Sequence, residues 1–104
     1  MPKDSNERLT PALILRILEQ NHFALKSLSV KRIGLFGSFL KGRGTDKSDL
    51  DFLVSLKNPT FDNFMETKFL LERLFKRKID LVTEQALKPD LRFVKKEALY
   101  AKAV

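Results

Sequence analysis

Apolar residues near the start of the chain recur at the spacing of an amphipathic helix. Thr10 and Pro11 form a helix-start signal, with threonine as the N-cap and proline in the first helical position. The apolar stripe that follows consists of Leu13, Ile14, Ile17, Leu18, Leu25 and Leu28. This period predicts one helix that runs from Pro11 to about Leu28. The single histidine, His22, falls outside the stripe and is predicted to lie on the surface without a functional role.

Three later segments have the apolar runs of β-strands, and two have helical periodicity. Strands are predicted at residues 30–37, 49–56 and 78–83. Helices are predicted from about residue 61 to 76, with the phenylalanine-rich side that includes Phe61 in the core, and over most of residues 86–101. A short helix is also expected directly after Gly37. The order αβαβαβα predicts an α/β (α+β) fold, a small mixed sheet flanked by helices.

The composition limits the class of protein. With 104 residues and no repeat or long linker, the chain is expected to form one domain over residues 1–104. No apolar run is long enough to cross a membrane, and residues 1–10 lack the hydrophobic block of a signal peptide, so we expect a cytoplasmic protein without a membrane partner. The absence of cysteine excludes disulfides, thiolate metal sites and cysteine nucleophiles, and one histidine is too few for a histidine cluster.

The charge of the chain favours an anionic partner. The formal net charge is +7, which suits a nucleotide, an acidic protein surface or, as a secondary choice, nucleic acid. Basic residues concentrate in two stretches, residues 31–47 and 88–104. Either stretch could equally be a solvated face. The first is the more informative, because it surrounds a glycine–serine turn.

Three aspartates occupy strand-like runs in which a charge is costly to bury. Asp49 and Asp51 are two positions apart, so their side chains share one side of a strand with a rise of roughly 6.6 Å between them. Asp80 in the third strand also points away from the core side. If the second and third strands are neighbours, three carboxylates gather on one face, which favours Mg²⁺ carrying a polyphosphate. Singly, each aspartate could be a turn former, a helix cap or an edge-strand surface residue.

A second group of residues could bind the phosphates. Gly37 and Ser38 end the first predicted strand, where unpaired backbone N–H groups and the serine hydroxyl suit an anion. Lys41 and Arg43 could add positive charge nearby. The pattern is neither GxxxxGK[ST] nor GxGxxG, and an isolated Gly-Ser pair is most often a plain turn.

The stretch GLFGSFLKGRGTDKSDLDFLV, residues 34–54, resembles the signature of the polymerase-β-type nucleotidyltransferases. It is most similar to the minimal nucleotidyltransferases (MNT proteins). The later KIDLVT, residues 78–83, is similar to the family's third strand, which carries its third carboxylate, and residues 86–101 are similar to its short closing helix. Lys41 stands where the family more often has arginine, and Arg43 and Gly44 make the loop more basic and flexible than usual. Neither departure removes a catalytic group.

The resemblance implies a polymerase-β-like palm that uses one or two Mg²⁺ ions to transfer AMP from ATP to a hydroxyl group. The catalytic and metal-binding residues it implies are Asp49, Asp51 and Asp80. The nucleotide-binding residues it implies are Gly37, Ser38, Lys41 and Arg43. Asp80 would also be the general base for the attacking hydroxyl.

The resemblance also bears on the acceptor, because the chain is too short to contain a separate acceptor domain. MNT proteins are typically encoded with a HEPN-type ribonuclease toxin, and in some pairs the enzyme transfers AMP to a tyrosine of that toxin. This implies a protein adenylyltransferase that acts as an antitoxin. Two alternatives stay open: transfer to RNA or a small molecule, and a non-catalytic antitoxin that neutralises its partner by binding alone.

Overall fold

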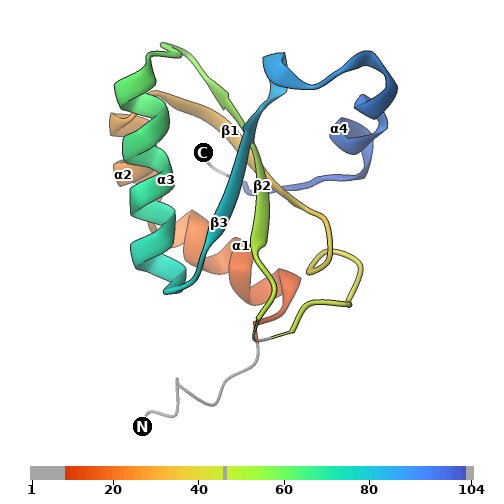
Figure 1. The fold of residues 1–104 in the computed structure, drawn as a ribbon. Helices are drawn as coiled ribbons and strands as arrows, with labels where there is room; N and C mark the ends of the chain where they lie inside the picture. The colour runs from red at the N-terminus through yellow and green to blue at the C-terminus, as the bar shows by residue number, and fades with distance from the viewer. Residues whose placement is uncertain (1–8, 46, 103–104) are drawn as a thin grey trace, which may run out of the picture.

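The computed structural model describes residues 9–45 and 47–102, which form a four-stranded mixed sheet with helices (Figure 1). The helices are α1 (Pro11–Gln20), α2 (His22–Ser27), α3 (Phe61–Phe75) and α4 (Phe93–Glu97). The strands are β1 (Val30–Phe36), β2 (Leu50–Leu56), β3 (Ile79–Thr83) and β4 (Leu99–Tyr100). Expectations for residues 1–8, Asp46 and residues 103–104 lie outside the described residues. Within residues 9–45 and 47–102, no helix is long and apolar enough to span a membrane.

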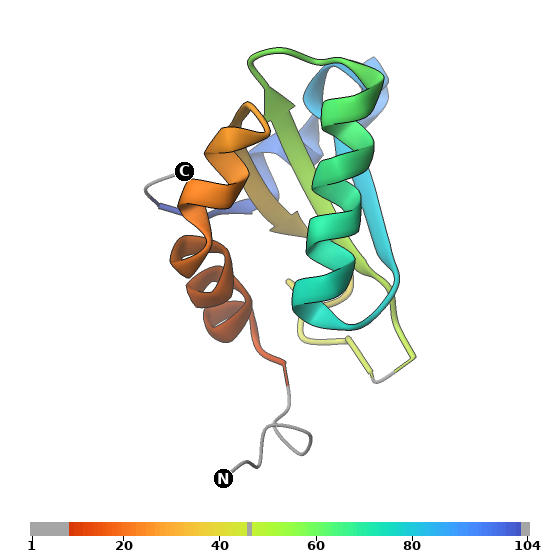
Figure 2. The same cartoon turned by 90° about the vertical axis from the view of Figure 1, so that its left-hand side faces the viewer.

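The strand order in the sheet is β3-β2-β1-β4. β1 is antiparallel to both β2 and β4, whereas β2 and β3 are parallel and are joined through α3, as a parallel pair requires a crossover. Helices α1, α2 and α3 cover one side of the sheet, and the segment that contains α4 lies on the other (Figures 1 and 2). The mixed sheet with flanking helices confirms the predicted fold class.

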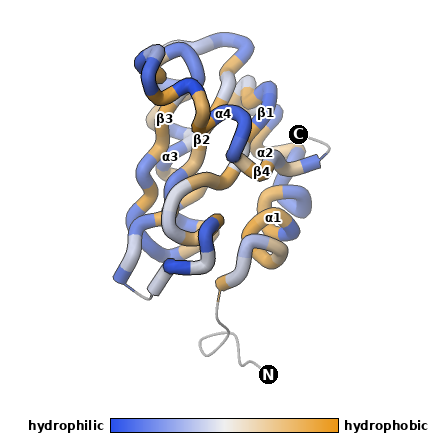
Figure 3. The backbone as a smooth tube through the Cα atoms, turned by 90° about the vertical axis from the view of Figure 1, so that its right-hand side faces the viewer, coloured by the Kyte–Doolittle hydropathy of each residue, from blue (hydrophilic) through white to orange (hydrophobic). Residues whose placement is uncertain are grey.

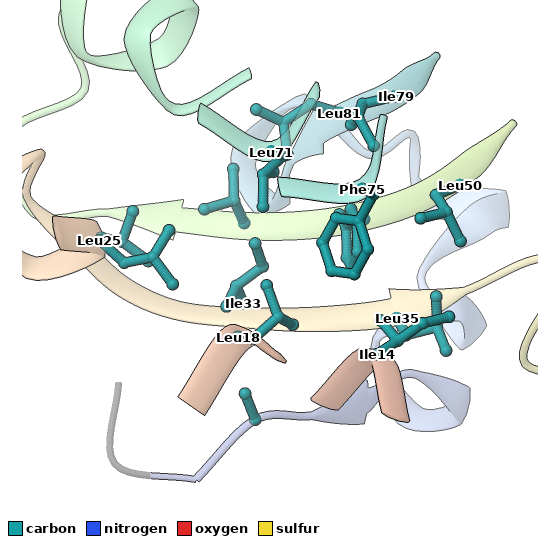
Figure 4. Close-up of a cluster of buried hydrophobic side chains, with 14 of the residues drawn as sticks. Ile14, Leu18, Leu25, Ile33, Leu35, Leu50, Leu71, Phe75, Ile79 and Leu81 are labelled. Carbon is teal, nitrogen blue, oxygen red and sulfur yellow. The ribbon is translucent and has the colours of Figure 1, made fainter. Parts of the chain in front are cut away.

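The hydrophobic core lies between the sheet and the three longer helices (Figure 4). Its fully buried members come from both layers and include Ile14, Leu18, Leu25, Ile33, Leu35, Phe52 and Leu71. In β2 the alternating residues Leu50, Phe52 and Val54 are buried against the helices. The residues between them therefore point to the opposite face of the sheet.

The first predicted helix is in fact two helices, because Asn21 interrupts it. The amide Nδ2 of Asn21 donates to the Ile17 carbonyl oxygen at 2.8 Å, and the Asn21 backbone N–H donates to the Leu18 carbonyl oxygen at 3.1 Å. Asparagine side chains compete in this way with the backbone pattern of a helix. The apolar stripe continues through the break, which is why periodicity alone predicted a single helix.

Helix α3 begins and ends close to the predicted limits. Thr60 is its N-cap, and the hydroxyl of Thr60 accepts a hydrogen bond from the Asn63 backbone N–H at 3.0 Å. The helix ends at Lys76, which has the left-handed φ of +54°. The prediction that Phe61 lies in the core was wrong, since Phe61 is 75% exposed. Phe61 is the first residue of α3.

The helix predicted over most of residues 86–101 was also wrong. The segment forms two short 3₁₀ turns, the five-residue helix α4 and the strand β4. Pairing with β1 overrides the helical period: the Ala101 backbone N–H donates to the Ile33 carbonyl oxygen at 3.0 Å. Gly34 makes this approach possible, because a Cβ at that position would come within 2.9 Å of the Tyr100 ring. Local propensity is a weak prior where tertiary pairing competes with it.

The carboxylate of Glu84 fastens this C-terminal segment to the sheet. Arg32 of β1 donates to it through Nη2 at 2.7 Å and Nε at 2.8 Å, and the Tyr100 hydroxyl donates at 3.2 Å. Lys95 of α4 adds a second cation at 3.8 Å. The hydrogen bonds and charge of Arg32 hold the pKa of Glu84 below its usual value, although burial opposes them. Figure 3 views the molecule from this side and shows α4 as hydrophilic.

Candidate active site

Asp51 and Asp80 lie directly opposite each other in the parallel pair β2 and β3. Their flanking residues are core residues, with Leu50 opposite Ile79 and Phe52 opposite Leu81. Both carboxylates therefore point away from α1, α2 and α3, on strands about 4.8 Å apart. Asp51 is partly buried on a central strand, and Asp80 is exposed on the edge strand.

Asp49 completes an acidic cluster around Asp51. It lies one residue before β2 begins, not inside the strand as predicted. The pKa of Asp51 is raised from 3.8 to about 6, first by burial, then by the charge of Asp80 and a hydrogen bond shared with it, and then by the charge of Asp49. The two other carboxylates are thus near enough to disfavour a negative charge on Asp51.

The turn after β1 brings Gly37 and Ser38 against the same carboxylate. Gly37 has a φ of +79°, and a Cβ there would overlap the Asp51 side chain, so only glycine allows this approach. A hydrogen bond from the Ser38 backbone lowers the pKa of Asp51 and partly offsets the effect of burial and like charges. The structure thus brings the glycine–serine turn and the aspartates together.

The short helix predicted after Gly37 is a series of turns instead. The Lys41 backbone N–H donates to the Gly37 carbonyl oxygen at 3.2 Å, and the Arg43 N–H donates to the Ser38 carbonyl oxygen at 2.8 Å. Gly42 then takes a φ of +76°, which ends any helical path. The loop from Gly37 to Ser48 joins the end of β1 to the start of β2 (Figure 1), and Asp49 and Asp51 follow it directly in the chain.

Lys41 and Arg43 are less closely associated with the cluster. The Lys41 ammonium lies 3.9 Å from a carboxylate oxygen of Glu97 in α4, and both side chains are about half exposed. The Arg43 side chain is exposed, and within the described residues it has no hydrogen bond or ion pair.

Sequence reasoning missed Arg77, which contacts the loop after β1. Its guanidinium donates to the carbonyl oxygens of Thr45 and Ser48, both at 3.1 Å, and lies 4.9 Å from the centre of the Phe39 ring. No local pattern could identify this residue, because its partners are about 30 to 40 positions away along the chain. A lone arginine before a strand is ordinarily a surface residue.

The acidic cluster has the donor chemistry of an open Mg²⁺ site. Within residues 9–45 and 47–102, no three acidic or histidine side chains are close enough together to enclose a metal ion by themselves. Mg²⁺ commonly takes only one or two carboxylates and completes its shell with phosphate oxygens and water. Asp51 and Asp80 in register, with the raised pKa of Asp51, fit a site of that kind.

Comparison with known proteins identifies the family. The model of the nucleotidyltransferase domain matches residues 15–102. "Protein adenylyltransferase MntA" of Thermococcus cleftensis is 36% identical over 73 residues, which are 68% of this chain and 74% of that protein. A solved structure, "Structure of putative minimal nucleotidyltransferase", has a TM-score of 0.76 and 28% identity, and the match covers 90% of this chain and 98% of that chain.

More distant structures share the fold. A crystal structure of the toxin–antitoxin pair MntA-HpeT has a TM-score of 0.59 and 19% identity, over 88% of this chain and 71% of that chain. The family match covers the acidic cluster, the glycine–serine turn and the segment up to β4. The chain therefore belongs to the nucleotidyltransferase domain family and is a nucleotidyltransferase.

Proposed function

We propose that this nucleotidyltransferase transfers AMP from ATP to a hydroxyl group of a partner protein and thereby acts as an antitoxin. The choice of AMP and of a protein acceptor is supported by the relative from Thermococcus cleftensis, whose name is protein adenylyltransferase MntA. The name MntA also appears in the toxin–antitoxin pair that shares this fold. From the resemblance of residues 34–54 to MNT proteins, the proposed acceptor is a tyrosine of a HEPN-type toxin encoded nearby.

The observation that carries this proposal is the meeting of Asp51, Asp80 and the Gly37 turn. Two carboxylates in register on neighbouring strands stand beside a turn that has no room for a side chain. A cluster of like charges is costly for stability and useful for holding a metal–nucleotide complex. A purely structural role would not need Asp51 to be partly buried among like charges.

In the proposed reaction, the acceptor oxygen forms a bond to the α-phosphorus of ATP while the bond from that phosphorus to pyrophosphate breaks. Asp80, exposed on the edge strand, accepts the proton of the acceptor hydroxyl. The backbone of Gly37 and Ser38 and the Ser38 hydroxyl bind the β- and γ-phosphates, and Lys41 releases Glu97 to approach them.

Mg²⁺ brought with the nucleotide would neutralise the phosphate charge that increases as pyrophosphate leaves. The side chains that would hold it are Asp49, Asp51 and Asp80. Their mutual repulsion in the metal-free protein would be relieved by such a cation, which is the physical reason to keep these carboxylates together.

The test is transfer of label from α-³²P-ATP in the presence of Mg²⁺ and the neighbouring HEPN-type protein. Label on a tyrosine of that protein supports the proposal, and the label should be absent with Asp51→Asn and unchanged with the exposed control Asp90→Asn. Label found only on RNA or a small molecule refutes the protein acceptor. Stable binding of the partner without any label, equally strong with Asp51→Asn, would favour neutralisation by contact alone.

A further inference from the structure

The side chain of Arg77 connects three segments that carry the candidate site. Arg77 follows the end of α3 and precedes β3, and Asp80 lies three positions after it. From there its guanidinium reaches the loop between β1 and β2, which is distant in sequence. One guanidinium nitrogen, Nη1, donates to two backbone carbonyl oxygens, those of Thr45 and Ser48, at 3.1 Å each.

The contact with Ser48 bears directly on Asp49. Because Ser48 immediately precedes Asp49, fixing the Ser48 carbonyl oxygen fixes the peptide plane that leads to the Asp49 backbone. The chain then enters β2 with a backbone hydrogen bond from Leu50 N–H to the Lys78 carbonyl oxygen at 3.1 Å, beside Arg77. Arg77 thus holds the start of β2 and the start of β3 together at the acidic cluster.

The contact with Phe39 bears on the phosphate-binding turn. Phe39 follows Ser38, is only 5% exposed, and lies under the guanidinium with 4.9 Å between the guanidinium carbon and the ring centre. The loop closes over the same ring at Gly44, where a Cβ would come within 2.5 Å of it. The ring, and with it the adjacent Ser38, is therefore held between the loop and Arg77.

We propose that Arg77 is a positioning residue of nucleotidyl transfer, which holds the Ser38 turn and Asp49 against β3 without touching the substrate. The proposal rests on the proposed site at Asp49, Asp51 and Asp80. The flat face of a guanidinium can stack on an aromatic ring while one of its nitrogens donates to two carbonyl oxygens, whereas a lysine ammonium has no flat face to stack. The contact with the Phe39 ring thus uses the feature that distinguishes arginine from lysine.

The first test measures binding of α,β-methylene-ATP with Mg²⁺ by calorimetry. Arg77→Ala is expected to raise the Kd about tenfold or more, and Arg77→Lys to give a smaller rise because it keeps the donor and loses the stacking. The matched control is Arg73→Ala, which removes the same charge from an exposed position in the last turn of α3 and should stay within about twofold. Equal Kd values for Arg77→Ala and Arg73→Ala would overturn the proposal.

The second test separates positioning from general stability. Amide hydrogen exchange in Arg77→Ala is expected to accelerate at Arg43 and Ser48, whose N–H groups close the loop, and at Leu50, which begins β2. Exchange is expected to stay unchanged in β1 and in the rest of β2. Uniform acceleration throughout the chain would mean that Arg77 is only a structural residue and would overturn the proposal.

The outcome for Arg77 is independent of the acceptor. A wild-type protein that binds the ATP analogue but labels no partner protein refutes the proposed acceptor, while the comparison of Arg77 and Arg73 variants still decides the role of Arg77. If the wild type bound no analogue, the role in substrate positioning would be refuted together with the site.

Discussion

Replacing Asp51 by asparagine should make the metal-free protein more stable at neutral pH. The carboxylate is partly buried beside Asp80 and Asp49, and its pKa is raised from 3.8 to about 6. The folded protein therefore binds a proton at Asp51 more tightly than the unfolded chain does. Stability falls as the pH rises from about 4 to about 6, and the full cost of the charge is present above that range. Asparagine has nearly the same shape and carries no charge, so it removes the cost.

The magnitude follows from the size of the shift. A rise of about two pKa units corresponds to about 3 kcal/mol, because each unit is worth 1.36 kcal/mol. Asp51 keeps contact with solvent, which screens the repulsion. We therefore expect Asp51→Asn to raise the free energy of unfolding by about 1–2 kcal/mol at pH 7.5. For a domain of this size, each kcal/mol raises the melting temperature by roughly 4–8 °C.

The assay is urea and thermal unfolding in the presence of a chelator at pH 7.5 and at pH 4. The gain in stability of Asp51→Asn over wild type should be present at pH 7.5 and close to zero at pH 4, where wild-type Asp51 is protonated. The exposed Asp90→Asn serves as the control for loss of one negative charge. Adding Mg²⁺ should stabilise the wild type more than Asp51→Asn. A destabilised Asp51→Asn protein at pH 7.5, or the same difference at both pH values, would refute the reasoning.

Three further substitutions probe separate features. Gly37→Ala puts a Cβ into the Asp51 carboxylate at a left-handed φ, so it should cost about 1–3 kcal/mol in a urea melt and abolish nucleotidyl transfer. Glu84→Gln should lower the free energy of unfolding by about 1–3 kcal/mol at pH 7, because the ionised carboxylate of Glu84 pairs with Arg32. Since the pKa of Glu84 is lowered in the folded protein, this loss should shrink in melts at acid pH, as the wild type itself loses the interaction. Thr60→Ala removes the N-cap of α3 and should cost about 1 kcal/mol with kcat unchanged, and Thr60→Ser should restore most of it.

Each of these outcomes has a result that would contradict it. Transfer by Gly37→Ala at the wild-type rate would mean that the turn can move away from Asp51 without consequence. If Glu84→Gln lost the same stability at every pH, the effect would come from packing and not from the charge of Glu84. A large fall in kcat for Thr60→Ala would show that the start of α3 affects the active site, contrary to the expectation.

The parts of the fold that follow from local periodicity were predictable. The core side of β2 and β3 alternates in the sequence, and this alternation alone placed Asp51 and Asp80 on the opposite side of those strands. Thr60 gave the start of α3 because a threonine cap is a local signal. A shared acidic face requires β2 and β3 to be neighbours, and their parallel register shows that they are.

The remaining features depend on contacts between distant residues. Strand β4 can pair with β1 because Gly34 leaves room for Tyr100. The helical period of residues 86–101 gives no indication of this pairing with β1. Arg77 likewise owes its position to Thr45 and Ser48, which no spacing rule connects to it. The break at Asn21 was within reach of sequence reasoning, since asparagine often caps helices, but the uninterrupted apolar stripe argued for continuity.

The pairing of β2 with β3 has a consequence for how the protein tolerates change. Side chains alternate along a strand, so a shift of β3 by one residue would turn Ile79 and Leu81 away from the core and bury Asp80 in it. The register that buries Ile79 and Leu81 also places Asp80 opposite Asp51, so the core and the acidic pair cannot change independently. Insertions or deletions between Phe75 and Ile79 should therefore be far more harmful than equal changes at the surface of α4. A shift of β3 would disrupt the packing of the core and the acidic pair together.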